Sequence, residues 1–192
     1  MKKSLKGTKT EQNLLAAFAG ESQARNRYSF FASVAKKAGY EQIAAIFLET
    51  ADNEKEHGKR FFKFLEGGDA TITAAYPAGK IGTTEENLAA AAAGERLEWT
   101  ELYQDAAGDA EREGFDDVAE VFRNIAKVEE KHEARYLKLL ANLNAGKVFK
   151  KDKKVRWKCR NCGYIHEGAE APDKCPACLH PRAFYEVFVE TY

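Results

Sequence analysis

A short motif, Glu-x-x-His, occurs twice in this sequence of 192 residues. The first copy joins Glu54 to His57, the second joins Glu129 to His132, and the copies are 75 residues apart. Residues three positions apart share one face of an α-helix, so each copy presents a carboxylate and an imidazole side by side. Oxygen and imidazole ligands together favour iron or manganese over a metal that prefers thiolates. The repeat therefore predicts a metal site built from two helices.

The two motifs belong to a longer internal repeat, in which Gly39 matches Gly114 and Phe61 matches Tyr136 at the same separation. In both copies apolar residues recur every three or four positions, and the glutamate and histidine interrupt that apolar series. The two series are Ile43, Phe47, Thr50, Glu54, His57, Phe61, Phe64 and Val118, Phe122, Ile125, Glu129, His132, Tyr136, Leu139. A single such motif is typical of a solvated helix face. Two copies on matching apolar faces favour a metal site instead.

The same three- or four-residue spacing places carboxylates on the apolar faces of two further helices. Glu21 lies on one of them, and Glu95 and Glu98 lie on the other. Unpaired carboxylates in a core each cost several kcal/mol, and a domain is stable by only about 5–15 kcal/mol. Two divalent cations would compensate the five glutamates. One glutamate from each of two helices, with Glu-x-x-His from the other two, is the layout of dinuclear iron or manganese proteins. We interpret Arg25, on the same face as Glu21, as a further counter-charge.

One irregularity in the repeat concerns Glu98. Gly20-Glu21 matches Gly94-Glu95 at a separation of 74, whereas Tyr28 and Tyr103 are 75 apart. One extra residue between Glu95 and Tyr103 predicts a π-bulge, a feature common at functional sites. We hypothesise that Glu98 is an added, mobile ligand; the alternative is an ordinary salt-bridged glutamate. Tyr28 and Tyr103 are expected to direct their hydroxyls to ligand carboxylates, with simple core packing as the alternative.

Start and stop signals divide the first part of the chain into four helices, which must position these residues. We expect helices over about residues 8–39, 40–66, 83–114 and 115–146, with capping boxes at Thr8 and Thr83. The joints at Gly39 and Gly114 are short and predict two antiparallel hairpins, whereas residues 67–83 are long enough to run the length of a bundle. This predicts a mainly α fold, a ferritin-like four-helix bundle with one long crossover. An up-down-up-down bundle and two separate hairpins are the alternatives.

All four cysteines lie near the C-terminus as two Cys-x-x-Cys pairs, Cys159 with Cys162 and Cys175 with Cys178. This spacing predicts a tetrahedral four-thiolate metal site in a small β domain that needs the metal in order to fold. A lysine-rich stretch near residue 150 marks the boundary, and we place the domains at 1–148 and 149–192. Spacing alone does not distinguish iron from structural zinc. We expect an aromatic core of Trp157, Tyr164 and Phe184.

Composition excludes several classes of protein. Lys and Arg total 30, Asp and Glu total 30, and this balance gives no general attraction to nucleic acid. No apolar run reaches the roughly 18 residues of a membrane span, and the first residues lack the apolar stretch of a signal peptide. We therefore expect a cytoplasmic protein with no membrane or nucleic-acid partner.

In combination, these residues resemble the rubrerythrin family along essentially the whole chain. The resemblance rests on the segment from Gly20 to Tyr28, both Glu-x-x-His motifs, Gly94-Glu95 through Glu98, and the rubredoxin-like cysteine pairs followed by Gly163-Tyr164 and Pro176. It implies a homodimer that reduces hydrogen peroxide to water at two non-haem irons. It also implies that the four cysteines hold a single iron, which receives electrons from NAD(P)H through a separate reductase or from a rubredoxin.

The resemblance further implies a role for each site residue. Glu54 and Glu129 would bridge the two irons, Glu21 and Glu95 would be terminal ligands, and His132 would bind one iron. The other iron would exchange His57 in the reduced state for Glu98 in the oxidised state. Tyr28 and Tyr103, with Glu98, would orient ligands or handle protons. The alternatives are a ferroxidase or oxygen-reducing iron-handling protein and, in another class, an electron carrier or zinc-stabilised binding module.

Overall fold

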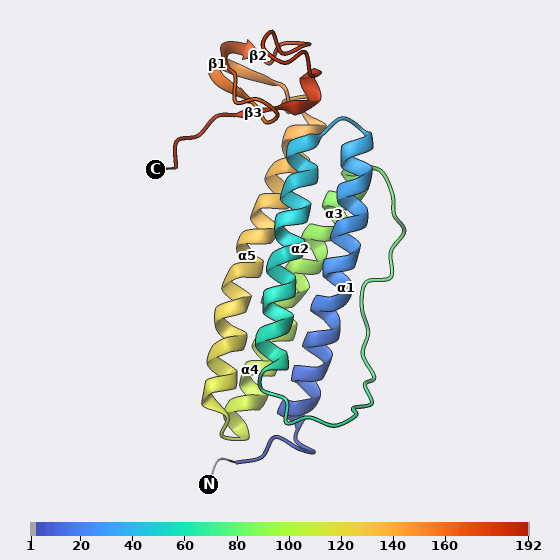
Figure 1. The fold of residues 1–192 in the computed structure, drawn as a ribbon. Coiled ribbons are helices and arrows are strands. Elements are labelled where there is room, and N and C mark those ends of the chain that lie inside the picture. The colour runs from blue at the N-terminus through green and yellow to red at the C-terminus, as the bar shows by residue number, and fades with distance from the viewer. Residues whose placement is uncertain (1–2, 192) are drawn as a thin grey trace.

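The computed structural model describes residues 3–191, so residues 1, 2 and 192 of the two predicted domains lie outside the described residues. A long helical bundle carries a small β domain at one end (Figure 1). The helices are α1 (Lys9–Lys37), α2 (Glu41–Phe62), α3 (Thr84–Leu97), a π-helix (Glu98–Leu102), α4 (Tyr103–Arg112) and α5 (Asp116–Asn144). The strands are β1 (Lys150–Cys159), β2 (Ile165–Glu170) and β3 (Tyr185–Val187).

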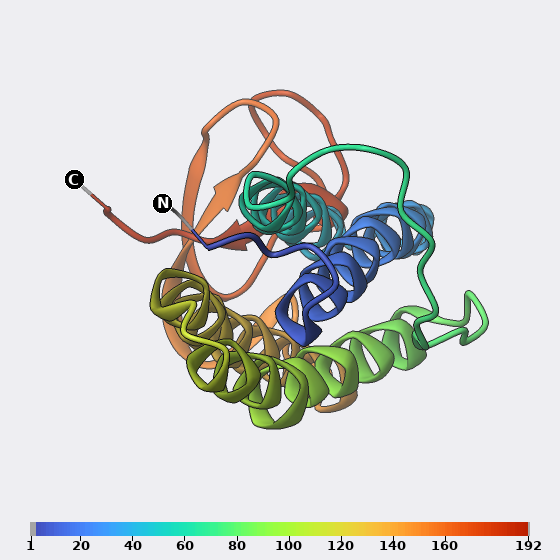
Figure 2. The same cartoon turned by 90° about the horizontal axis from the view of Figure 1, so that it is seen from below.

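The bundle consists of two antiparallel hairpins joined by one long crossover. Helix α1 packs along α2, and α5 packs along α3 and α4, which the π-helix joins into one continuous element. The crossover leaves the end of α2, runs beside α1 for much of the bundle's length and enters α3 at the opposite end (Figures 1 and 2). The predicted bundle with a long crossover is therefore confirmed, and the up-down-up-down alternative is excluded.

The turns between paired helices depend on glycine. Gly39 and Gly114 have φ values of 83° and 74°, a left-handed conformation that costs glycine little and ends the preceding helix. The predicted capping box at Thr83 is present. At Thr8 only half of it forms, because the Glu11 carboxylate accepts from the Gly7 amide. Helix α2 ends at Phe62 rather than near residue 66, because the next residues tighten into a shorter turn.

Two layers of buried aromatic rings fill the bundle, one on each side of the Glu-x-x-His motifs. One layer contains Tyr28, Phe31, Phe47 and Tyr136, and the other contains Phe61, Tyr103 and Phe122. The closest ring centroids are 5.1 Å apart in the first layer and 4.8 Å apart in the second. The internal repeat relates the layers, since Tyr28, Phe47 and Phe61 match Tyr103, Phe122 and Tyr136. The polar residues of the two motifs thus lie between two layers of apolar rings.

The β domain is a three-stranded antiparallel sheet in the order β2-β1-β3. Trp157 is fully buried, as predicted, and its indole N–H donates to the Gly168 carbonyl. The prediction for Tyr164 was wrong, because this side chain is 37% exposed in the loop before β2, and Phe184 is only partly buried. Tyr185 takes the core position instead, because β3 pairs it directly with Cys159.

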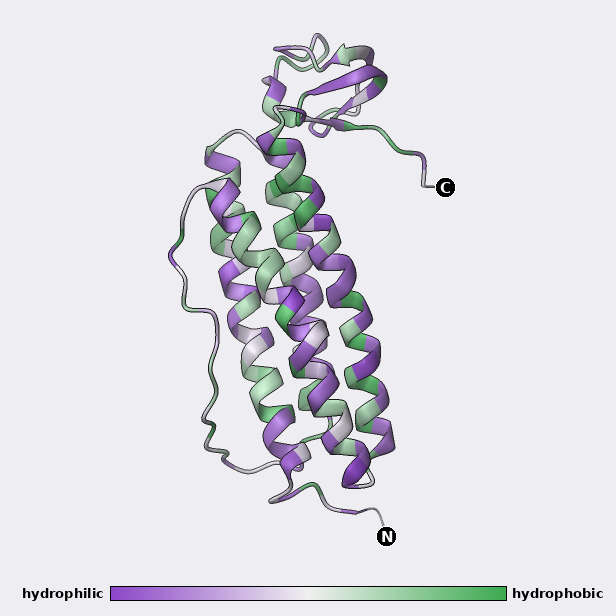
Figure 3. Ribbon diagram, turned by 180° about the vertical axis from the view of Figure 1, so that it is seen from behind, coloured by the Kyte–Doolittle hydropathy of each residue, from purple (hydrophilic) through white to green (hydrophobic). Residues whose placement is uncertain are grey.

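The β domain contacts the bundle through aromatic packing. The ring of Tyr40, which directly precedes α2, stacks on Phe149, with centroids 6.1 Å apart. The predicted boundary between residues 148 and 149 stays a prediction. Along each helix of the bundle, hydrophilic and hydrophobic residues alternate, as expected of helices that bury one face (Figure 3). Within residues 3–191, no helix has the length and apolar character needed to cross a membrane.

Candidate metal centres

Six of the predicted ligands converge at the middle of the bundle in two overlapping groups. Within each group, one ligand atom from every residue lies within 4.8 Å of the others. The first group is Glu21, Glu54, His57 and Glu129, and the second is Glu54, Glu95, Glu129 and His132. Because Glu54 and Glu129 belong to both, the geometry describes two adjoining sites that share two carboxylates.

The two histidines approach the shared carboxylates in matching ways. His57 Nδ1 lies 2.9 Å from Glu54 Oε2 and 2.9 Å from Glu129 Oε1. His132 Nδ1 lies 2.8 Å from Glu129 Oε2 and 3.2 Å from Glu54 Oε1. The imidazole centroids are 6.0 Å apart. The Nδ1 atom of each histidine therefore faces both shared carboxylates.

Several of these close approaches are not hydrogen bonds. Whether the buried atoms have hydrogen-bond partners therefore tests whether the site is suited to a metal. The buried atoms that lack a hydrogen-bond partner include Glu21 Oε2, Glu54 Oε1, Glu95 Oε2, both Glu129 oxygens and His132 Nδ1. Leaving buried polar atoms unpaired is costly, and native proteins rarely do so. Divalent cations coordinated by these atoms would satisfy them and compensate the carboxylate charge. The residues present thus fit a dinuclear carboxylate and histidine centre.

Burial and crowding strongly perturb the pKa values in this cluster. Burial, together with neighbouring carboxylates, raises the pKa of Glu21 well above its usual value and that of Glu95 to about 8. Burial opposes the ionised form of Glu54, but the close approach of both histidines outweighs it and holds the pKa at about 2. Burial likewise lowers the histidine pKa values, and the carboxylates reverse this, to about 9 at His57 and about 12 at His132. Without cations, the cluster retains protons that a metal would displace.

Each predicted tyrosine donates to a carboxylate on the opposite hairpin. The Tyr103 hydroxyl donates to Glu21 Oε1 over 2.6 Å, and the Tyr28 hydroxyl donates to Glu95 Oε1. Burial raises the pKa of both phenols, so both remain protonated donors. Each hydrogen bond fixes the orientation of one carboxylate while leaving the second oxygen free to coordinate.

Glu98 lies at the first residue of the π-helix, which occupies the position that the 74-against-75 offset predicts. It belongs to neither ligand group, whereas His57 belongs to one. Its side chain is partly buried and lines a cavity beside Tyr103. Burial and the carboxylates of Glu95 and Glu129 raise the pKa of Glu98, and Arg27 opposes them. Its assignment as a ligand stays a prediction.

The prediction for Arg25 was wrong, and a different arginine lies near the site. Arg25 is exposed, because α1 turns Ala24 inward at that level. Arg27 instead reaches the cavity beside Glu98, and its Nη1 donates to the Pro77 carbonyl over 3.4 Å. Gly94 leaves room for it, since an added Cβ would lie 3.1 Å from Arg27 Nη2.

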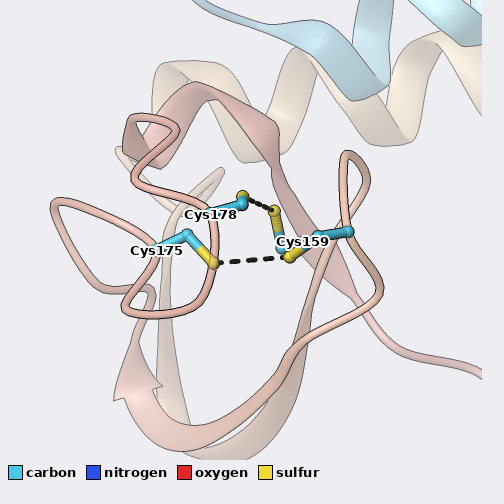
Figure 4. A group of neighbouring side chains, drawn as sticks. Cys159, Cys175 and Cys178 are labelled. Carbon is cyan, nitrogen blue, oxygen red and sulfur yellow. Dashed lines mark hydrogen bonds between the residues drawn. The ribbon is translucent and has the colours of Figure 1, made fainter.

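The four cysteine sulfurs form a second centre in the β domain. All four Sγ atoms lie within 4.8 Å of one another, with Cys159 and Cys178 3.7 Å apart and Cys162 and Cys175 3.6 Å apart. Figure 4 shows the thiol of Cys159, at the end of β1, converging with those of Cys175 and Cys178, which lie in the loop after β2. None is in a disulfide. A backbone hydrogen bond from His180 lowers the pKa of Cys178 to about 6, so this thiol is readily available as a thiolate ligand.

Comparisons with known proteins agree with this arrangement. The family model "Rubrerythrin" matches residues 12–140, and the model "Rubrerythrin, rubredoxin-like domain" matches residues 157–186. The chain is 62% identical to a rubrerythrin of Porphyromonas gingivalis, covering 100% of this chain and 96% of that protein. It is 57% identical to a rubrerythrin of Nitratidesulfovibrio vulgaris, covering 96% and 97%. Fully reduced nigerythrin, a solved structure at 32% identity, has a TM-score of 0.64 and covers 96% of this chain and 92% of that one.

Proposed function

The chain belongs to the rubrerythrin family, and we propose from that premise that it is a non-haem di-iron peroxidase that reduces hydrogen peroxide to water. The predicted cofactors, a di-iron site in the bundle and one iron in four cysteines, follow from the family and from the two clusters. The observation that carries the proposal is the pair of adjoining Glu/His groups sharing Glu54 and Glu129, on the same chain as a four-thiolate centre.

In this proposal each ligand has the role that membership of the family implies. Glu54 and Glu129, which belong to both ligand groups, would be shared by the two irons, Glu21 and Glu95 would each hold one iron, and His132 would bind one of them. When bound, two ferrous ions would supply the two electrons needed to cleave the O–O bond of peroxide. The hydrogen bonds from Tyr103 and Tyr28 hold Glu21 and Glu95 in place throughout.

Glu98 and His57 alternate in the proposed cycle. His57 belongs to one ligand group and Glu98 to neither, so these two side chains are the candidates for the exchanged ligand. The raised pKa of Glu98 lets its carboxyl hold a proton while it is detached, and it can release that proton to a peroxide oxygen as it moves inward. The π-helix supplies the irregular backbone for this motion, because its first residue is Glu98 itself.

The four-cysteine iron is the proposed entry point for electrons. A single iron in four thiolates changes its charge by one electron at a time, so two transfers are needed for each peroxide. We propose that electrons arrive from NAD(P)H through a separate reductase, or from a rubredoxin, and that the chain works as a homodimer in the cytoplasm.

A turnover assay tests the function. Iron-loaded protein is supplied anaerobically with NADH, a rubredoxin reductase and hydrogen peroxide, and NADH oxidation is followed. Glu98→Ala should lower the rate by about a hundredfold if Glu98 transfers a proton. Glu101→Ala is the matched control, because Glu101 is an exposed glutamate in the same π-helix. Equal rates in both variants would contradict the role of Glu98, and no peroxide consumption by the wild type would contradict the function.

Crystal structures of the iron-loaded protein in reduced and oxidised states test the exchange. The proposal expects His57 bound and Glu98 detached in the reduced crystal, and the reverse in the oxidised crystal. Identical coordination in both states would refute the exchange while leaving the peroxidase activity to be judged by turnover.

A further inference from the structure

A cavity of about 260 Å³ lies between α1, the π-helix and the crossover. One wall comes from α1 at Ala16 and Ala17, and another from the crossover at Ala74 and Ala75. Figures 1 and 2 show the crossover running along this side of α1. Segments distant in sequence therefore enclose one chamber.

The cavity reaches the residues of the proposed peroxide chemistry. Glu98 and Tyr103 both line it, and the Tyr103 hydroxyl donates to the ligand-group residue Glu21. Gly20 and Gly94, which directly precede Glu21 and Glu95, also form part of the wall. A molecule in the cavity is thus next to the carboxylate that is proposed to move.

The size and lining of the cavity exceed what hydrogen peroxide requires. A water molecule occupies about 30 Å³ in the liquid, so hydrogen peroxide, with two oxygens, would fill roughly a quarter of the space. The remaining lining is largely apolar and includes Leu97, Leu102, Ala106 and Phe122. Apolar chambers with a few polar groups at one point are typical of sites that bind the organic part of a small molecule.

We propose that this cavity binds the organic group of alkyl or aryl hydroperoxides, and that the protein reduces them as well as hydrogen peroxide. The inference rests on the proposed peroxidase function and names a further substrate class for the same site. In the reaction the O–O bond of ROOH breaks, two electrons from the reduced protein and two protons are taken up, and ROH and water form. The apolar group R would lie against Ala16, Ala17 and Ala106, with the O–O bond directed toward Glu98.

Binding can be measured separately from catalysis with 2-phenyl-2-propanol, the alcohol formed from cumene hydroperoxide. Isothermal titration of the oxidised, iron-loaded full chain should show saturable binding. Ala16→Leu should weaken this binding by about tenfold, because the added carbons occupy the space meant for R. Ala19→Leu is the matched control, since Ala19 lies on the same helix but does not line the cavity. Ala74→Leu fills the cavity from the crossover and is a second variant in case the first perturbs α1.

The same variants are then compared in turnover with cumene hydroperoxide and with hydrogen peroxide. The inference expects the filling variants to lower kcat/KM for cumene hydroperoxide about tenfold while hydrogen peroxide stays within about twofold. Absent binding, equal losses with both peroxides, or turnover of hydrogen peroxide alone by the wild type would overturn the inference and leave the proposed function standing. Failure of the wild type with both peroxides would overturn both.

Discussion

The metal-free protein should lose stability as the pH rises from about 5 to 9, because its buried cluster depends on bound protons. Burial raises the pKa of Glu95 from 4.5 to about 8, and contacts with Glu129 and Glu54 outweigh burial to raise that of His57 from 6.5 to about 9. Both groups bind protons more tightly when folded. Their stabilisation is complete below the unfolded pKa and is lost as pH rises through the folded pKa.

The expected loss is large compared with the stability of a domain. Each pKa unit corresponds to 1.36 kcal/mol, so a rise from 4.5 to about 8 at Glu95 amounts to on the order of 5 kcal/mol. Total stabilities are about 5–15 kcal/mol. Glu54 acts in the opposite direction, since its pKa of about 2 gives stability that is lost only as pH falls below about 4.5. The metal-free bundle should therefore be most stable near pH 5.

Denaturant unfolding, followed by far-ultraviolet circular dichroism, measures this effect in metal-free and metal-loaded protein at several pH values. The stabilisation by metal should grow with pH, because cations replace protons that become harder to retain. Glu95→Gln should make the metal-free protein more stable at pH 9 and weaken metal binding. Glu101→Gln, at an exposed position, should do neither. A metal-free stability that is constant or increases from pH 5 to 9 would refute the reasoning.

Three further predictions concern single contacts. Tyr103→Phe keeps the ring but removes the donor to Glu21, and should lower the unfolding free energy of the metal-loaded protein by about 1.5–3 kcal/mol; no change would show that the hydrogen bond is dispensable. Cys162→Ser should abolish iron–thiolate absorption and unfold the β domain while helical circular dichroism persists; retained absorption would contradict the four-thiolate site. Gly163→Ala, at φ 80°, should destabilise the β domain by about 1–2 kcal/mol, whereas Leu179→Gly, at φ 63°, should not; thermal melts of that domain decide between them.

The features that could be predicted from sequence are those fixed by local spacing. Gly39 and Gly114 mark the hairpin turns because only a left-handed residue ends these helices cheaply. The one-residue offset before Tyr103 predicts the π-helix because an insertion in a packed helix must be absorbed locally. The spacing of apolar residues placed Glu54 and Glu129 inward, because residues three or four positions apart share one helix face.

The features that were missed depend on tertiary contacts. Arg25 follows Glu21 by four residues, but 3.6 residues per turn leave Ala24 as the inward position at that level. Arg27 reaches the cavity only because its long side chain passes Gly94 and meets the crossover at Pro77. Tyr185 is buried because β3 pairs with β1, and no local sequence pattern indicates this pairing. The cavity itself is formed by segments far apart in the chain, so no local pattern indicates it.

The most direct test of the central claim is a single-turnover comparison of two oxidants. Iron-loaded protein is fully reduced without oxygen, then mixed in a stopped-flow instrument with hydrogen peroxide or with oxygen while the iron–thiolate absorption is followed. The account predicts that absorption returns much faster with peroxide than with oxygen, since electrons leave the four-cysteine iron as peroxide is reduced. Faster oxidation by oxygen would contradict the account and identify an oxygen-reducing or ferroxidase protein instead.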